Sequence, residues 1–139
     1  MNELKVSIST GNRKMGEIPS VSLPACTTCN PDAPCFKDCY AVKIARLYKT
    51  ANAAYHRNLD ILERDPVAYW DQVRRAASMT RYFRFHVSGD IPNMDYFHNM
   101  VSLARDLTNT SFLVRIIRTR LSCLRCCACV ARRKMLRSL

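Results

Sequence analysis

The stretch YFRFHVS, residues 82–88, decides the fold because it is the clearest strand in the chain. It is rich in aromatic residues, and a glycine ends it. On a period of two, His86 shares one face with Arg84 and Ser88, while the apolar side chains occupy the other face. If the sheet leads to a site at the end of this strand, His86, Ser88 and Asp90 line that site.

Helical patterns lie on both sides of this strand. Upstream, apolar residues recur at three- and four-residue spacings in two successive stretches within residues 40–62. The Asp-Pro pair at 65–66 then starts a helix that runs to about Met79, with the aspartate as N-cap and the proline at the first helical position. Downstream, Asn93 or Asp95 caps another helix.

Two further strands complete the pattern, at residues 4–9 (LKVSIS) and 111–118 (SFLVRIIR). Residues 13–38 contain four prolines and read as a long ordered loop. The order strand, loop, helix, helix, strand, helix, strand predicts an α/β fold with right-handed crossovers. Since three strands cannot close a barrel, we expect an open or partial parallel sheet, like truncated TIM-barrel β/α units. One metal-binding domain would span residues 1–118.

The formal net charge of +11 is unevenly distributed. Residues 1–110 carry 14 Lys and Arg against all 11 Asp and Glu, whereas residues 111–139 carry 8 basic residues and no acid. The chain has no apolar run long enough to span a membrane and no signal-peptide core, so we expect a cytoplasmic protein that does not enter a membrane. Its three glycines argue against a glycine-rich phosphate loop.

The segment 119–139 differs in composition from the rest, since it contains no Gly, Pro, Asp or Glu. It reads as a basic, cysteine-rich tail, either helical or disordered, or as a non-native ending such as a frameshifted or truncated reading frame. Its arginines favour weak, salt-sensitive nucleic-acid binding. The tail contains four cysteines: Cys123, Cys126, Cys127 and Cys129. No second zinc knuckle (a further pair of closely spaced cysteines) and no histidine completes a metal site around them, and their role stays open.

A second group of four cysteines lies within 14 residues, just before the first helix: Cys26, Cys29, Cys35 and Cys39. In a chain without a secretory signal, such a group indicates metal or redox chemistry before disulfides. Thiolates this close repel one another unless a cation takes up their charge. The spacing leaves three alternatives: a four-cysteine zinc site, an iron–sulfur cluster, or reduced thiols without a metal.

Two phrases carry a resemblance to a known family: ISTGNRKMGEIPSVSLPACTTCNPDAPCFKDCYA at 8–41 and FRFHVSGDIPNMDYF at 83–97. Over about residues 7–110 the chain resembles the phage "gene product 88" family. The cysteines common to that family match Cys29, Cys35 and Cys39, and Cys26 is an addition. The resemblance stops near residue 113, beyond which this chain departs from the family.

That family is in turn similar to radical S-adenosylmethionine enzymes, which place three cluster-binding cysteines on the loop after the first strand of a partial barrel. The resemblance implies a 4Fe-4S cluster on Cys29, Cys35 and Cys39. It also implies S-adenosylmethionine at the end of the 82–88 strand, against His86, Ser88, Gly89 and Asp90. The cysteine spacing departs from the usual pattern of that superfamily, and Tyr40 follows the last cysteine where the superfamily has an aromatic residue before it.

Two functions are therefore expected from different classes. The first is a phage-type iron–sulfur protein resembling a radical S-adenosylmethionine enzyme. Its substrate is unknown, and a truncated chain would be inactive. The second is a non-catalytic zinc module that contacts nucleic acid through its tail. The first requires the cysteine loop and the turn after residues 82–88 to open on the same edge of the sheet, with Asp90 on the order of 10 Å from the sulfurs.

Overall fold

The computed structural model describes residues 4–11, 13–14 and 16–114. Four strands in these ranges form one open sheet in the order β1-β2-β3-β4: β1 (Ile8–Ser9), β2 (Ser20–Val21), β3 (Tyr82–Phe85) and β4 (Ser111–Val114). β1 pairs with β2 antiparallel, and the other two pairings are parallel. The expected α/β class with an open parallel sheet is confirmed, apart from the antiparallel edge that β1 adds.

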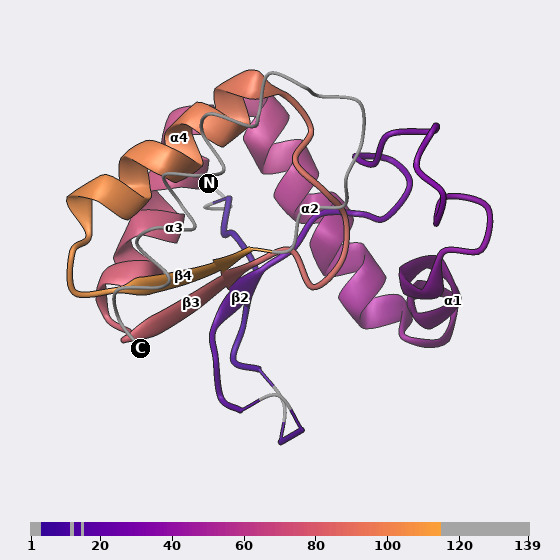
Figure 1. Ribbon diagram of the computed structural model, residues 1–139, viewed down its shortest axis with the longest axis horizontal. Coiled ribbons are helices and arrows are strands. Elements are labelled where there is room, and N and C mark those ends of the chain that lie inside the picture. Colours follow the sequence, from indigo (N-terminus) through magenta and orange to yellow (C-terminus); the bar gives the residue numbers. More distant parts are fainter. Residues whose placement is uncertain (1–3, 12, 15, 115–139) are drawn as a thin grey trace.

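The helices of the described chain are α1 (Tyr40–Leu47), α2 (Lys49–Arg64), α3 (Pro66–Ser78) and α4 (Met94–Asp106). α2, α3 and α4 lie on the same side of the sheet (Figure 1). Asp65 caps α3 as predicted, because its side chain accepts a hydrogen bond from the backbone N–H of Ala68. Asn93, and not Asp95, caps α4 by accepting from the N–H of Tyr96. None of the helices in the described ranges is long and apolar enough to cross a membrane.

The strand β3 shows the alternation expected from its sequence. Phe83 and Phe85 are fully buried on the helix-covered face, while Tyr82 is exposed. In the parallel register, Phe83 lies opposite Phe112 of β4, so the two strands present aromatic rings to the same layer. Burying each such ring stabilises the fold by roughly 1.5–3 kcal/mol.

The prediction of a strand over residues 4–9 is mostly wrong, because only Ile8 and Ser9 are in a strand. Side-chain amides of two helices take the place of a neighbouring strand for residues 4–7. Gln72 accepts from the N–H of Val6 and donates to the carbonyl of Leu4. The buried Asn58 both accepts from the N–H and donates to the carbonyl of Ser7.

The second strand of the sheet, β2, was expected to be loop. The prolines that argued against regular structure lie just outside it, at positions 19 and 24. A proline lacks only its own N–H, and the carbonyl of Pro19 still accepts from Arg84. β2 can therefore pair with β3 despite the nearby prolines, and Ile8 and Ser9 form an antiparallel edge strand next to β2 instead of a parallel neighbour of β3.

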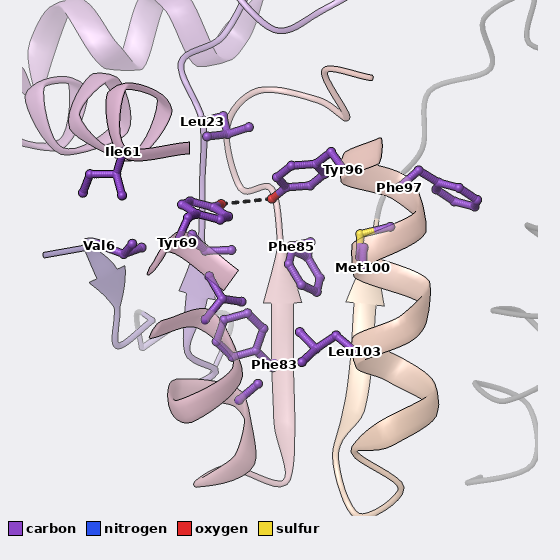
Figure 2. Packing of buried hydrophobic residues seen from close by; sticks show 13 residues of the cluster. Val6, Leu23, Ile61, Tyr69, Phe83, Phe85, Tyr96, Phe97, Met100 and Leu103 are labelled. Atoms are coloured by element: carbon purple, nitrogen blue, oxygen red, sulfur yellow. Dashed lines mark hydrogen bonds between the residues drawn. The ribbon is translucent and has the colours of Figure 1, made fainter. Parts of the chain in front are cut away.

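Aromatic side chains from α3, α4 and β3 form the centre of the core (Figure 2). The hydroxyls of Tyr69 and Tyr96 share a buried hydrogen bond of 3.1 Å. Their rings also contact Trp70, whose centroid lies 4.8 Å from that of Tyr96. This cluster contacts Phe85, the last residue of β3, and His86, which follows it.

Candidate functional site

The turn after β3 is held against the segment after β2. The N–H of His86 donates to the carbonyl of Val21, and the N–H of Leu23 donates to the carbonyl of Ser88. Between these bonds, Ser22 Oγ accepts from the N–H groups of Val87 and Ser88. The parallel pairing thus continues past both strands and brings their two following loops together at one edge of the sheet.

His86 departs from the face predicted for it. Its backbone is left-handed, with φ of 61°, which breaks the alternation after Phe85. The imidazole consequently lies against the core, with its ring centroid 5.4 Å from that of Tyr96. It is therefore not on the face of the sheet that Arg84 occupies. Burial lowers the pKa of His86 to about 4, an effect only partly offset by the backbone of Ser88, so the ring is neutral at pH 7.

Two side chains at this turn are buried without partners. Within the described ranges, the two ring nitrogens of His86 have no hydrogen-bond partner of good geometry. The same holds for the Oγ of Ser88. Burying a polar group in this way costs about 1–3 kcal/mol unless something satisfies it. Each such group calls for an explanation, and one explanation is a ligand site in which a bound molecule supplies the missing partner.

Gly89 allows the closest approach between the two loops. Its φ of 78° lies in the left-handed region, and a Cβ there would be 2.6 Å from the carbonyl oxygen of Leu23 and 2.8 Å from Thr28 Oγ1. Every residue other than glycine would force the backbone apart. Gly89 of the SGD motif (Ser88-Gly89-Asp90) is thus explained by contact with the segment that carries the cysteines.

Asp90 joins the turn to the cysteine loop directly. Its N–H donates to Thr28 Oγ1 at 3.1 Å, and the same hydroxyl donates to the carbonyl of Pro24. The Asp90 carboxylate accepts from the N–H of Ile91 at 2.8 Å. Burial raises the pKa of Asp90, although the Ile91 N–H opposes this. A half-buried carboxylate therefore lies close enough to Cys29 to influence its thiol.

The cysteine loop, residues 24–39, folds as a series of tight turns. Hydrogen bonds from Ala33 to Asn30 and from Phe36 to Ala33 close two of them. Cys26 adopts a left-handed φ of 64°, and its Sγ lies 3.8 Å from the carbonyl oxygen of Phe36. All four thiols of this loop are free; Cys35 is exposed and the other three are partly buried.

The thiols interact electrostatically with one another and with Asp90. Burial raises the pKa of Cys29, and the charges of Asp90, Cys26 and Cys39 add to that rise against the opposing Cys26 backbone. Burial likewise raises the pKa of Cys26, and the neighbouring thiols of Cys39 and then Cys35 add to that rise. Cys26 is thus a neighbour of Cys39, although the family pattern treats it as an addition.

The predicted ligand set is assembled only in part. Within the residues that the structure describes, no three His, Cys, Asp or Glu side chains are arranged as a ready-made metal site. The mutual closeness expected of the sulfurs of Cys29, Cys35 and Cys39 is therefore not seen there. Assignment of these thiols to a metal stays a prediction.

The expected placement of the two motifs on one edge of the sheet is confirmed, but by a different strand. The cysteine loop follows β2, which is parallel to β3, and does not follow residues 4–9. Ser22 and Thr28, which connect the motifs, are not among the site residues that the sequence predicts. The alternation in Ser20-Val21-Ser22-Leu23 was the available signal, since it is typical of a short strand.

A family model described as "Gene product 88" matches residues 3–114. The chain belongs to the gene product 88 family. The match contains both the cysteine loop and the SGD turn, and it ends close to residue 113, where the departure was expected. No curated protein and no solved structure matches this gene product 88 protein. The tail at 119–139, with Cys123, Cys126, Cys127 and Cys129, lies outside the described residues, as do positions 115–118 of the third predicted strand.

Proposed function

We propose that this gene product 88 protein is an iron–sulfur protein that binds S-adenosylmethionine in the manner of radical S-adenosylmethionine enzymes. The observation that carries the proposal is the hydrogen bond from the Asp90 N–H to Thr28 Oγ1, which joins the thiol-bearing loop to the SGD turn. A single small cofactor that touches both a metal cluster and a carboxylate needs these two segments side by side.

The donor set fits a soft metal. Four free thiols on one loop, with partial burial of three, provide the sulfur ligands that iron–sulfur clusters and zinc prefer. Cys29, Cys35 and Cys39 would hold a 4Fe-4S cluster. Because burial and neighbouring charges favour the protonated form of Cys29, metal binding must displace its proton and is expected to strengthen as pH rises.

The SGD turn fits the amino-acid part of the cofactor. The half-buried Asp90 carboxylate can accept hydrogen bonds from an ammonium group, and Gly89 removes the side chain that would block close approach. Neutral His86 and Ser88 Oγ hold unused donors and acceptors for orienting a polar ligand. A bound cluster, once reduced by an external one-electron donor, would supply the electron for cleavage of S-adenosylmethionine, and these residues would bind and orient that cofactor.

A second candidate is a closed zinc site made by all four thiols. It is favoured by the interaction of Cys26 with both Cys39 and Cys35, because a fourth thiol completes tetrahedral coordination and leaves no position open. In this reading the protein is a non-catalytic module that contacts nucleic acid, as expected above for its basic tail.

Anaerobic purification followed by iron, sulfide and zinc analysis separates the two candidates. A brown protein with equal iron and sulfide supports the cluster, whereas one zinc per chain without visible absorption supports the zinc site. Equilibrium dialysis then measures S-adenosylmethionine binding. Asp90→Asn should weaken it about tenfold or more, and the exposed carboxylate variant Asp95→Asn on α4 should leave it unchanged. Equal effects of the two variants would contradict the proposed role of Asp90.

A further inference from the structure

The net positive charge of the described chain is concentrated in one short segment. Residues 4–114 contain fourteen Lys and Arg against ten Asp and Glu. Residues 40–59, which form α1 and the first part of α2, contain four of these cations and no acidic residue. The remainder of residues 4–114 is therefore neutral overall, and the segment 40–59 accounts for the whole excess.

The helix α1 presents its cations on an uncovered face. No residue of α1 is buried, and helical geometry places Tyr40, Lys43, Arg46 and Leu47 on one side. All four are exposed in the structure, including 75% of Tyr40. Figure 1 shows α1 beside the cysteine loop, at the end of the molecule away from β4.

The junction of α1 and α2 adds two further exposed residues of the same kinds. Tyr48 is 62% exposed and Lys49 follows it, also exposed. The ion pairs recorded between described residues are Arg64–Asp60 and Arg74–Asp106, so none of Lys43, Arg46 and Lys49 is neutralised in that way. In the preceding loop, Lys37 and Asp38 cancel one another.

Two exposed tyrosine rings near three cations that form no ion pair with another described residue have the composition of a single-stranded nucleic-acid surface. Bases stack on exposed aromatic rings, and lysine and arginine contact the phosphates between them. Membrane binding fits less well, because an eight-residue helix with one exposed leucine offers little apolar area for a bilayer. Charge complementarity therefore favours a polyanion that carries stacking groups.

We propose that α1 and its junction with α2 bind single-stranded nucleic acid through Tyr40, Tyr48, Lys43, Arg46 and Lys49. The residues of this surface are other than those of the basic tail and of the turn at Gly89. It would bring a nucleic-acid strand next to the cysteine loop, since α1 starts directly after Cys39. Nucleic-acid contact is thereby assigned to the folded body of the protein.

Fluorescence anisotropy with a labelled oligothymidine tests the proposal on the full chain. The variant with Lys43, Arg46 and Lys49 all changed to Gln should bind roughly tenfold or more weakly at low salt, and its slope of log affinity against log salt should fall by about 2. The matched control changes three exposed arginines elsewhere, Arg75, Arg81 and Arg105, to Gln. It removes the same charge and should lower affinity less than about threefold.

Variants of the two tyrosines separate the contribution of base stacking to binding from the contribution of charge. Tyr40→Ser combined with Tyr48→Ser should weaken binding about tenfold without changing the salt slope, and the corresponding double Phe variant should bind like the natural protein. Metal content and circular dichroism, measured for every variant, distinguish loss of this surface from loss of the cysteine site. Equal effects of the two triple variants, no effect of the Ser variants, or binding to equimolar phosphatidylserine–phosphatidylcholine vesicles without binding to the oligonucleotide would overturn the proposal.

Discussion

The backbone N–H of Asp90 and the hydroxyl of Thr28 form a 3.1 Å hydrogen bond across 62 positions of sequence. Thr28 is buried, and its hydroxyl simultaneously donates to the carbonyl of Pro24. One side chain therefore organises its own loop and fixes the turn after β3. The relative position of the cysteines and the SGD motif depends on this residue.

Thr28→Val should loosen that connection. Valine has nearly the shape of threonine but leaves the part-buried N–H of Asp90 without its acceptor, so we expect a loss of roughly 1–3 kcal/mol in the free energy of unfolding. Thr28→Ser keeps the hydroxyl and should lose less. Urea unfolding monitored by tryptophan fluorescence provides the comparison. A Ser variant less stable than the Val variant would show that the methyl group, and not the hydrogen bond, matters.

Gly89→Ala should be the more damaging of two glycine substitutions. A Cβ at Gly89 would meet backbone and Thr28 atoms closer than 3 Å in addition to the left-handed strain, for an expected loss of roughly 2–4 kcal/mol. Gly16 also has a left-handed φ, of 83°, but the nearest atom to its Cβ position is 3.9 Å away. Gly16→Ala should thus cost only the strain, about 1 kcal/mol. Thermal or urea unfolding of both variants measures the difference, which vanishes if crowding at Gly89 is unimportant.

Single Cys→Ser variants should reveal the ligand number. Replacing Cys29, Cys35 or Cys39 should abolish metal retention, because each change removes one thiolate from a three-cysteine site. Cys26→Ser should retain metal if the family pattern holds. Metal per chain after gel filtration is the measurement. Equal loss in all four variants would favour the four-thiol site that the closeness of Cys26 to Cys39 suggests.

Acid should destabilise the fold through His86. The folded pKa is about 4 because the ring is buried, whereas an unfolded histidine titrates near 6.5. Between these values the unfolded chain binds a proton that the folded chain does not, so the free energy of unfolding should decrease as pH falls from about 6.5 to 4, by up to about 3 kcal/mol.

His86→Asn should flatten this part of the pH profile. Asparagine does not titrate and tolerates the left-handed backbone at this position. Urea unfolding at pH 7 and near pH 4.5 gives the required comparison, with the exposed His98→Asn variant of α4 as the control. A profile unchanged by His86→Asn would mean that other groups cause the acid sensitivity.

Local features of the fold could be predicted from the amino-acid sequence. The Asp65 cap, the apolar alternation of Phe83 and Phe85, and the glycine after Ser88 each depend on residues a few positions apart. Such signals survive in sequence because helix caps and strand faces are made by near neighbours. The α/β class followed from them, as did the nearness of the two motifs at one sheet edge.

Tertiary contacts alone decided the strand order, the path of residues 4–7 and the turn at His86. β2 exists because β3 pairs with it, and residues 4–7 leave the sheet because Asn58 and Gln72 satisfy their backbone from the helices. The left-handed turn at His86 buries a ring that simple alternation would have placed with Arg84. Hydrogen bonds and burial between residues more than 50 positions apart leave no periodic trace in the sequence, so the partners of the cysteine loop became visible only once the chain was folded.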